Sequence, residues 1–196
     1  MLKIFIHTWK INRWEEVLEE QLKYIEDSGL GKEAVTEVCY NDDEGKTLLD
    51  IWNFCNNEDS YVLYLQNLGI TYHGITKLEN MTAKYRRWVM DGVVGNWKEY
   101  VSYLKEFDVV ADNFKEEEKD YKKHFAANMW WSKSEYIKTL ESPQKIIGDR
   151  SGYKGINHEH WPCTNVSGKF KNIRKNNDIE PHRAYKYKQR RGVERF

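Results

Sequence analysis

The chain has 196 residues, of which 40% are hydrophobic and 32% charged, and its formal net charge is zero. This length suits one domain, and the composition is that of a soluble globular protein, which excludes a disordered or membrane-spanning chain. The three cysteines are widely spaced and form no CxxC pair, which argues against a disulfide framework or a zinc knuckle and favours a reducing cytoplasm.

The first 70 residues alternate between two hydrophobic periods. Apolar, β-rich runs at 3–8, 34–40 and 60–65 predict three strands. Between them, residues 13–28 and 48–55 carry apolar side chains at helical spacing and predict two helices. This β-α-β-α-β order with short connections predicts an α/β fold with a mostly parallel sheet and right-handed crossovers.

Polar and aromatic side chains follow each of the three predicted strands. In a parallel sheet the ligand lies beyond the carboxyl ends of the strands, so these side chains would share one edge. The residues concerned are His7, Thr8 and Trp9 after the first strand, Asn41 and Asp42 after the second, and Gln66 and Asn67 after the third. We interpret them as a nucleotide site; the alternative is that strand ends are polar because they reach water.

The middle of the chain is mainly helical by its spacing. Residues 81–92 and 96–107 predict two helices, and 108–111 predict a short strand. The charge run at 115–123 predicts a solvated helix or loop, and residues 132–140 predict a further helix that opens with a capping box.

The last 31 residues differ in composition from the rest of the chain. Residues 166–196 contain ten Lys or Arg and three Asp or Glu, a net charge of +7. Few aliphatic residues occur there, so we expect a single domain at 1–165 followed by a basic tail. The tail would suit a nucleic acid or an anionic membrane surface, which would place the protein peripherally on a membrane; the alternative is a solubilising segment.

Several motifs are missing from the chain. It has no GxGxxG after the first strand, no GxxxxGK[ST], no HExxH and no GxSxG. Their absence argues against a dinucleotide-dependent oxidoreductase, a P-loop NTPase, a zincin and an α/β hydrolase. An α/β start without glycine fingerprints favours folds that hold nucleotides with strand-end side chains, such as the GT-A sugar-nucleotide transferases.

One block of eight residues, 124–131, concentrates chemistry-bearing side chains. His124 and Asn128 offer directed hydrogen bonds, and Trp130 and Trp131 offer faces on which a sugar can stack. Two alanines between them would let the backbone approach a ligand. The alternative is that the paired tryptophans are core residues.

The same block carries a family resemblance. Residues 124–140, HFAANMWWSKSEYIKTL, resemble the HFSGNFWWA…YLRTLP signature of a family of small GT-A-like glycosyltransferases. Residues 64–71, YLQNLGIT, resemble that family's YLHTKG element, and weaker matches extend the similarity over 3–161. The resemblance implies a GT-A-like, Rossmann-like sheet flanked by helices and a hexosyl- or pentosyltransferase that uses a UDP- or GDP-sugar donor.

The chain departs from that family pattern in three places. Leu68 stands where the family has a lysine, and Ala126-Ala127 replace Ser-Gly. No DxD follows the third strand; the acidic run Asp42-Asp43-Glu44 follows the second. The resemblance therefore leaves dependence on a divalent metal, Mn²⁺ or Mg²⁺, open, and within this acidic run Asp42 is the candidate ligand.

Sugar transfer needs a stabilised diphosphate leaving group and a deprotonated acceptor hydroxyl. His124, with Arg86 or Arg87 as second choices, is our candidate for the leaving group, and Asp42, Asp112 and Glu159 are the candidates for base or metal contact. The sequence thus predicts a glycosyltransferase acting on a glycan or macromolecular hydroxyl. The alternative is a non-catalytic nucleic-acid-binding domain that uses aromatic stacking and the basic tail.

Overall fold

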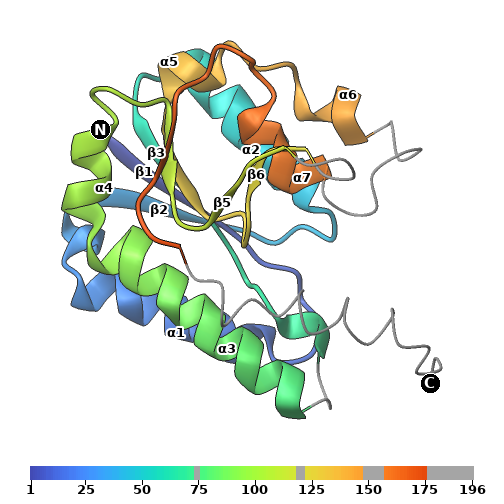
Figure 1. Ribbon diagram of the computed structural model, residues 1–196. Coiled ribbons are helices and arrows are strands. Elements are labelled where there is room, and N and C mark those ends of the chain that lie inside the picture. The colour runs from blue at the N-terminus through green and yellow to red at the C-terminus, as the bar shows by residue number, and fades with distance from the viewer. Residues whose placement is uncertain (73–75, 118–121, 148–156, 176–196) are drawn as a thin grey trace.

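The structure is a computed structural model and describes residues 1–72, 76–117, 122–147 and 157–175. Its centre is a six-stranded sheet in the order β2-β1-β3-β7-β4-β8 (Figure 1). The strands, in that order, are Ala34–Cys39, Leu2–His7, Tyr61–Gln66, Trp130–Lys133, Val109–Ala111 and Phe170–Asn172. A separate two-stranded sheet pairs β5, Phe114–Lys115, with β6, His124–Phe125.

The six-stranded sheet is mixed but mostly parallel. β1 lies parallel to both β2 and β3, and β4 lies parallel to β8. β7 is antiparallel to its two neighbours, β3 and β4, so it is the one strand of this sheet that is reversed. The predicted α/β domain with a mostly parallel sheet flanked by helices is therefore confirmed.

Helices cover both faces of the sheet (Figure 1). One face carries α1, α3, the π-helical turn η3 and α4, whose bounds are Trp14–Asp27, Thr76–Met90, Asp91–Gly95 and Trp97–Tyr103. The other carries α2, α5, α6 and α7, which are Glu44–Asn57, Ser134–Ile137, Pro143–Ile147 and Asn157–His160. Short 3-10 turns occur at Leu30–Lys32, Ile70–Tyr72 and Trp161–Cys163. Within the described residues, no helix is both long and apolar enough to cross a bilayer.

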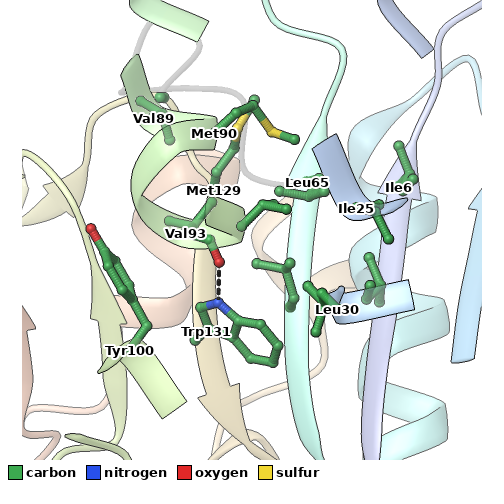
Figure 2. Packing of buried hydrophobic residues seen from close by; sticks show 14 of the residues in the cluster. Ile6, Ile25, Leu30, Leu65, Val89, Met90, Val93, Tyr100, Met129 and Trp131 are labelled. Carbon is green, nitrogen blue, oxygen red and sulfur yellow. Dashed lines mark hydrogen bonds between the residues drawn. The ribbon is translucent and has the colours of Figure 1, made fainter. Parts of the chain in front are cut away.

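Each face of the sheet has its own hydrophobic core, because successive side chains of a strand point to opposite faces. Ile6 and Trp131 belong to the core under α1 and α3, whereas Phe5 and Trp130 belong to the core under α2. Figure 2 shows the first core, in which the Trp131 indole N–H donates to the carbonyl of Val93 at 2.7 Å. Both indoles are fully buried, which anchors β7 from both sides.

The beginning of the predicted tail is part of this sheet. β8 pairs with β4, and the backbone N–H of Lys169 donates to the Asp108 carboxylate at 2.8 Å. The boundary predicted between residues 165 and 166 therefore does not coincide with the edge of the fold. Residues 176–196, which hold most of the predicted basic tail, lie outside the described residues.

Candidate functional site

A cleft of about 360 Å³ opens at the carboxyl ends of β1 and β3 and is bordered by the residues that follow β2. In the sheet, β2 and β3 are the neighbours of β1 on its two edges. α1 connects β1 to β2, and α2 connects β2 to β3. The two crossovers consequently lie on opposite faces of the sheet (Figure 1). Such a reversal of strand order is where ligands bind in open α/β sheets.

Five of the seven residues predicted at the strand ends line this cleft: His7, Trp9, Asp42, Gln66 and Asn67. The other two, Thr8 and Asn41, do not line it. Thr8 is fully buried, and Asn41 donates to the Thr47 hydroxyl at 2.9 Å. The structure thus brings most of the predicted strand-end set together at one edge.

Trp9 contributes an aromatic surface to the cleft. It is 40% exposed, whereas the Asn67 side chain beside it is buried. Asn67 Nδ2 donates to the Trp9 carbonyl at 3.0 Å, and the Trp9 N–H donates to Asn67 Oδ1 at 3.4 Å. Asn67 therefore holds the Trp9 backbone in place while the residue remains accessible to a ligand.

His7 and Gln66 are tied to the protein around the cleft. His7 Nδ1 lies 2.9 Å from the Thr47 hydroxyl, and burial lowers the pKa of His7, which favours its neutral form. Gln66 Nε2 donates to the carbonyl of Ala127 at 2.6 Å. These contacts fix the floor of the cleft to α2 and to the turn before β7.

Glu44, the first residue of α2, contacts polar side chains from β3, from the turn before β7 and from α7. Its Oε1 accepts hydrogen bonds from the Tyr64 hydroxyl at 2.6 Å and from Asn128 Nδ2 at 2.7 Å. Its Oε2 lies 3.5 Å from Nδ1 of His158. Burial alone would raise the pKa of Glu44, but His158 and Tyr64 together hold it below its ordinary value of 4.5. Glu44 is therefore an oriented, ionised carboxylate.

His158, from α7, closes one side of the cleft. Its Nε2 lies 3.7 Å from Oδ1 of Asp43, the residue whose side chain caps α2 by accepting the Gly45 N–H at 2.8 Å. His158 and Asp43 each have 27% of the side chain exposed. The imidazole thus lies between two carboxylates that both border the cleft.

Glu44, Tyr64 and His158 are site residues that the sequence did not predict. Of the run 42–44 only Asp42 was a predicted site residue, although an acidic residue followed by a helix is a signal for a helix start and would have pointed to Glu44. Tyr64 lies inside a strand, and nothing in its spacing marks its hydroxyl as functional. His158 stands next to the predicted Glu159, so the only available signal was the cluster of ionisable residues at 158–160.

His124 and Glu159, both predicted as catalytic, do meet. His124 Nε2 lies 3.9 Å from Glu159 Oε2, and His124 Nδ1 donates to the carbonyl of Lys122 at 2.8 Å. Neither residue lines the cleft, but Glu159 is adjacent to His158, which does. The predicted pair therefore lies beside the cleft rather than in it.

The rest of the 124–131 block divides between site and core. Asn128 reaches Glu44, and the Trp130 indole N–H donates to Asn128 Oδ1 at 2.9 Å. Trp130 and Trp131 have no exposed surface, so the prediction that they offer stacking faces to a sugar is wrong for this structure. The physical reason is that β7 is an interior strand, whose side chains are buried on both faces of the sheet.

Asp112 and Arg86 also lie outside the cleft. Asp112, fully buried after β4, pairs with Arg174 and accepts the Tyr100 hydroxyl at 2.6 Å. Arg86 donates to Glu20 and to the carbonyl of Leu68, both at 2.8 Å. Asp112 is thus part of a buried ion pair, whereas Arg86 holds the backbone of Leu68, which lines the cleft.

The cleft residues do not form a ready metal site. Asp42, the predicted candidate ligand, pairs with Lys46 at 2.6 Å on the surface. Among the described residues, no group of three or more His, Cys, Asp or Glu is arranged to hold a metal ion.

Comparison with known proteins identifies a family but no activity. The family model described as "Domain of unknown function (DUF8361)" matches residues 3–196. No curated protein and no solved structure matches the chain. The matched range includes residues 166–196, the predicted basic tail.

Proposed function

The chain belongs to the DUF8361 family, and we propose that it is a GT-A-like glycosyltransferase that moves a sugar from a nucleotide-sugar donor to an acceptor hydroxyl. The observation that carries the proposal is the cleft at the reversal of strand order, with side chains from three strand ends. The GT-A-like assignment rests on the resemblance of residues 124–140, and the mostly parallel sheet with helices on both faces supports it.

The lining of the cleft suits a nucleoside. In nucleotide-binding α/β folds, an acidic residue after the second strand accepts hydrogen bonds from ribose hydroxyls. Asp42 and Asp43 occupy that place here. Trp9 adds a partly exposed aromatic face on which a base or a sugar ring can stack.

The charge of the lining constrains how the diphosphate would bind. Among the described residues that line the cleft there are three carboxylates and no Lys or Arg. We therefore expect most of the binding free energy to come from contacts with the nucleoside and the sugar, whose hydroxyls can donate hydrogen bonds to these carboxylates. Because a diphosphate can bring Mn²⁺ or Mg²⁺ with it, binding is tested both with and without the metal ion.

The nucleic-acid-binding alternative gains nothing from the described residues. Arg174 is paired with Asp112, and Lys171 lies over the rings of Tyr103 and Phe107. These cations of the C-terminal region are thus engaged within the fold. Of the aromatic residues that could stack on bases, Trp130 and Trp131 are buried.

A ligand screen tests the proposal. We expect UDP, GDP or one of their sugar derivatives, with or without Mn²⁺, to raise the melting temperature of the full chain. Ligand at about 100 times Kd stabilises a protein by about 2.7 kcal/mol, which is several degrees for a domain of this size. No rise with any nucleotide or sugar nucleotide, under either metal condition, would contradict it.

Trp9 provides the matched variant for that screen. Trp9→Ala should weaken nucleotide affinity by about tenfold or more, because stacking on an aromatic side chain contributes about 1–3 kcal/mol per base. Tyr40→Ala is the control, since Tyr40 is 52% exposed but does not line the cleft. Fluorescence titration measures both affinities, and an equal loss in the two variants would remove Trp9 from the site.

A further inference from the structure

We propose that His158 accepts the proton of the acceptor hydroxyl and that Glu44 is its positioning carboxylate, so that the sugar is transferred with inversion at the anomeric carbon. This inference rests on the proposed function and deepens it. Both residues line the cleft, with 27% of the His158 side chain and 17% of the Glu44 side chain exposed.

The geometry is that of an imidazole backed by a carboxylate. Glu44 Oε2 lies 3.5 Å from Nδ1 of His158. A carboxylate at this position orients the ring and stabilises the imidazolium that forms when the other nitrogen takes up a proton. Glu44 therefore acts through His158, and His158 is the residue that would touch substrate.

Glu44 is itself held from two other parts of the chain. Tyr64, in β3, and Asn128, before β7, both donate to Oε1, which turns Oε2 toward His158. Asn128 adopts φ +46° and the preceding Ala127 φ +85°. Left-handed backbone is unfavourable for residues other than glycine and is retained where the surrounding structure enforces it, often at functional sites.

Other charged groups face the same pair. Asp43 lies 3.7 Å from Nε2 of His158. His7, on β1, and His158 both act electrostatically on Glu44 and help to lower its pKa. Glu159, next to His158 in α7, acts electrostatically on Tyr64.

His124 is a weaker candidate for the same role. Its Nδ1 donates to a backbone carbonyl, its Nε2 lies 3.9 Å from Glu159, and it does not line the cleft. Asp112 is fully buried in its ion pair with Arg174. Of these ionisable candidates, His158 is the one with both a carboxylate partner and access to the cleft.

The proposed step balances as a single displacement. The acceptor oxygen forms a bond to the anomeric carbon while the bond from that carbon to the phosphate oxygen breaks. The electron pair of the broken bond leaves with the nucleoside diphosphate, and the proton of the acceptor hydroxyl moves to His158. A base on the face opposite the leaving group is the arrangement of inverting sugar chemistry.

The kinetic test uses the full chain, with the sugar nucleotide that raises the melting temperature most as donor and water as acceptor. His158→Gln should lower kcat by about 100- to 10,000-fold, the usual contribution of general acid–base catalysis. Donor affinity, measured by fluorescence titration, should stay within about threefold of wild type. His160→Gln is the matched control, because His160 lies in the same helix, contacts the Lys123 carbonyl and does not line the cleft.

Glu44 is tested by its effect on the pH profile. Glu44→Gln should lower kcat and displace the acid limb of the kcat profile, and Glu44→Asp should restore part of both. Unchanged kcat in either His158→Gln or Glu44→Gln would overturn the pairing while leaving the proposed function intact. Release of the sugar with retained anomeric configuration, followed by NMR before mutarotation, would overturn the displacement.

A further measurement does not depend on a ligand. Because His158 helps to lower the pKa of Glu44, His158→Gln should raise that pKa in an NMR titration of the glutamate carboxyl carbons. An unchanged pKa would show that the two groups are not coupled and would overturn the inference. Absence of any nucleotide binding by wild type would instead refute the proposed function, and the inference with it.

Discussion

Two consecutive non-glycine residues occupy the left-handed region in the turn between β6 and β7. Ala127 has φ +85° and Asn128 φ +46°. Asparagine tolerates this region because its short polar side chain can bond locally, whereas alanine gains nothing from it. Both residues nevertheless contribute contacts to the cleft, Ala127 through its carbonyl to Gln66 and Asn128 through its side chain to Glu44.

Ala127→Gly should stabilise the protein. A left-handed conformation costs an L-residue about 1–2 kcal/mol, while the greater freedom of glycine in the unfolded chain costs about 0.5–1 kcal/mol. We therefore expect the free energy of unfolding, measured by urea denaturation, to rise by about 0.5–1 kcal/mol. Ala126→Gly is the control: Ala126 has no positive φ, so the change should destabilise. Equal destabilisation by both variants would show that the backbone of Ala127 is not strained.

The pair Trp130 and Trp131 shows where residue-level interpretation failed. A tryptophan next to His and Asn suits a sugar site, and the same residues suit an interior strand. Side-chain chemistry cannot separate the two, because exposure depends on the strands β3 and β4 that flank β7. The prediction for Asn128 is correct only in part, because Asn128 contacts the site through Glu44 and does not line the cleft itself.

At the scale of elements, an ion pair between Arg174 and Asp112 ties the segment after β8 to the core of the fold. The Nε of Arg174 donates to both carboxylate oxygens of Asp112 at 3.2 Å, and the guanidinium lies 4.4 Å from the centre of the Trp88 ring. A Cβ on Gly92 would come within 2.4 Å of Arg174, Asp112 and Tyr100. The π-helical turn η3 thus needs glycine at this position to make room for the pair.

Arg174→Met should lower the free energy of unfolding by about 3 kcal/mol, because it leaves a buried carboxylate without its cation. That is the lower end of the usual range, since 28% of the Arg174 side chain is exposed while Asp112 is fully buried. The double variant Arg174→Met/Asp112→Asn should regain part of the lost free energy of unfolding. Lys138→Met, which removes a surface pair with Asp59, should change the free energy of unfolding much less, because solvent screens an exposed ion pair. Similar losses in the two single variants, measured by urea denaturation, would contradict a special role for β8.

At the scale of the whole molecule, several buried groups make stability depend on pH in the same sense. Burial lowers the pKa of His7 and His160 below the ordinary value of 6.5. In the folded protein these rings stay neutral below pH 6.5, whereas the unfolded chain takes up protons there. Glu20 and Glu44, whose ion-pair partners outweigh burial and lower their pKa below 4.5, add to the effect in more acidic solution.

We therefore expect the melting temperature to fall as the pH falls from 7 toward 5. The unfolded state binds more protons than the folded state in that window, so acid favours unfolding. His160→Gln should reduce the slope of melting temperature against pH below pH 6.5. Near pH 8 the slopes of the variant and of wild type should be the same. A slope identical to that of wild type would show that His160 titrates alike in both states.

Local patterns were enough to predict the first half of the fold and one edge of the site. A strand repeats its apolar residues every two positions and a helix every three to four. Both patterns involve only residues that are close in the chain, so the β-α-β-α-β order could be inferred without the structure. Parallel strands share a carboxyl edge, and this rule alone placed His7, Asp42 and Gln66 together. β7 and β8 gave no such signal, because they are short strands of four and three residues with no clear alternation.

The sequence by itself determined the α/β class and the residues delivered by β1, β2 and β3. Only the tertiary structure decided that Glu44, from a turn-like acidic run, meets Asn128, 84 residues later, and that Asp112 is taken up by Arg174. The physical reason is that burial and pairing of a polar group depend on which distant elements pack against it. A carboxylate has the same chemistry in a cleft and in an ion pair, and its surroundings exist only once the sheet and both helical layers have assembled.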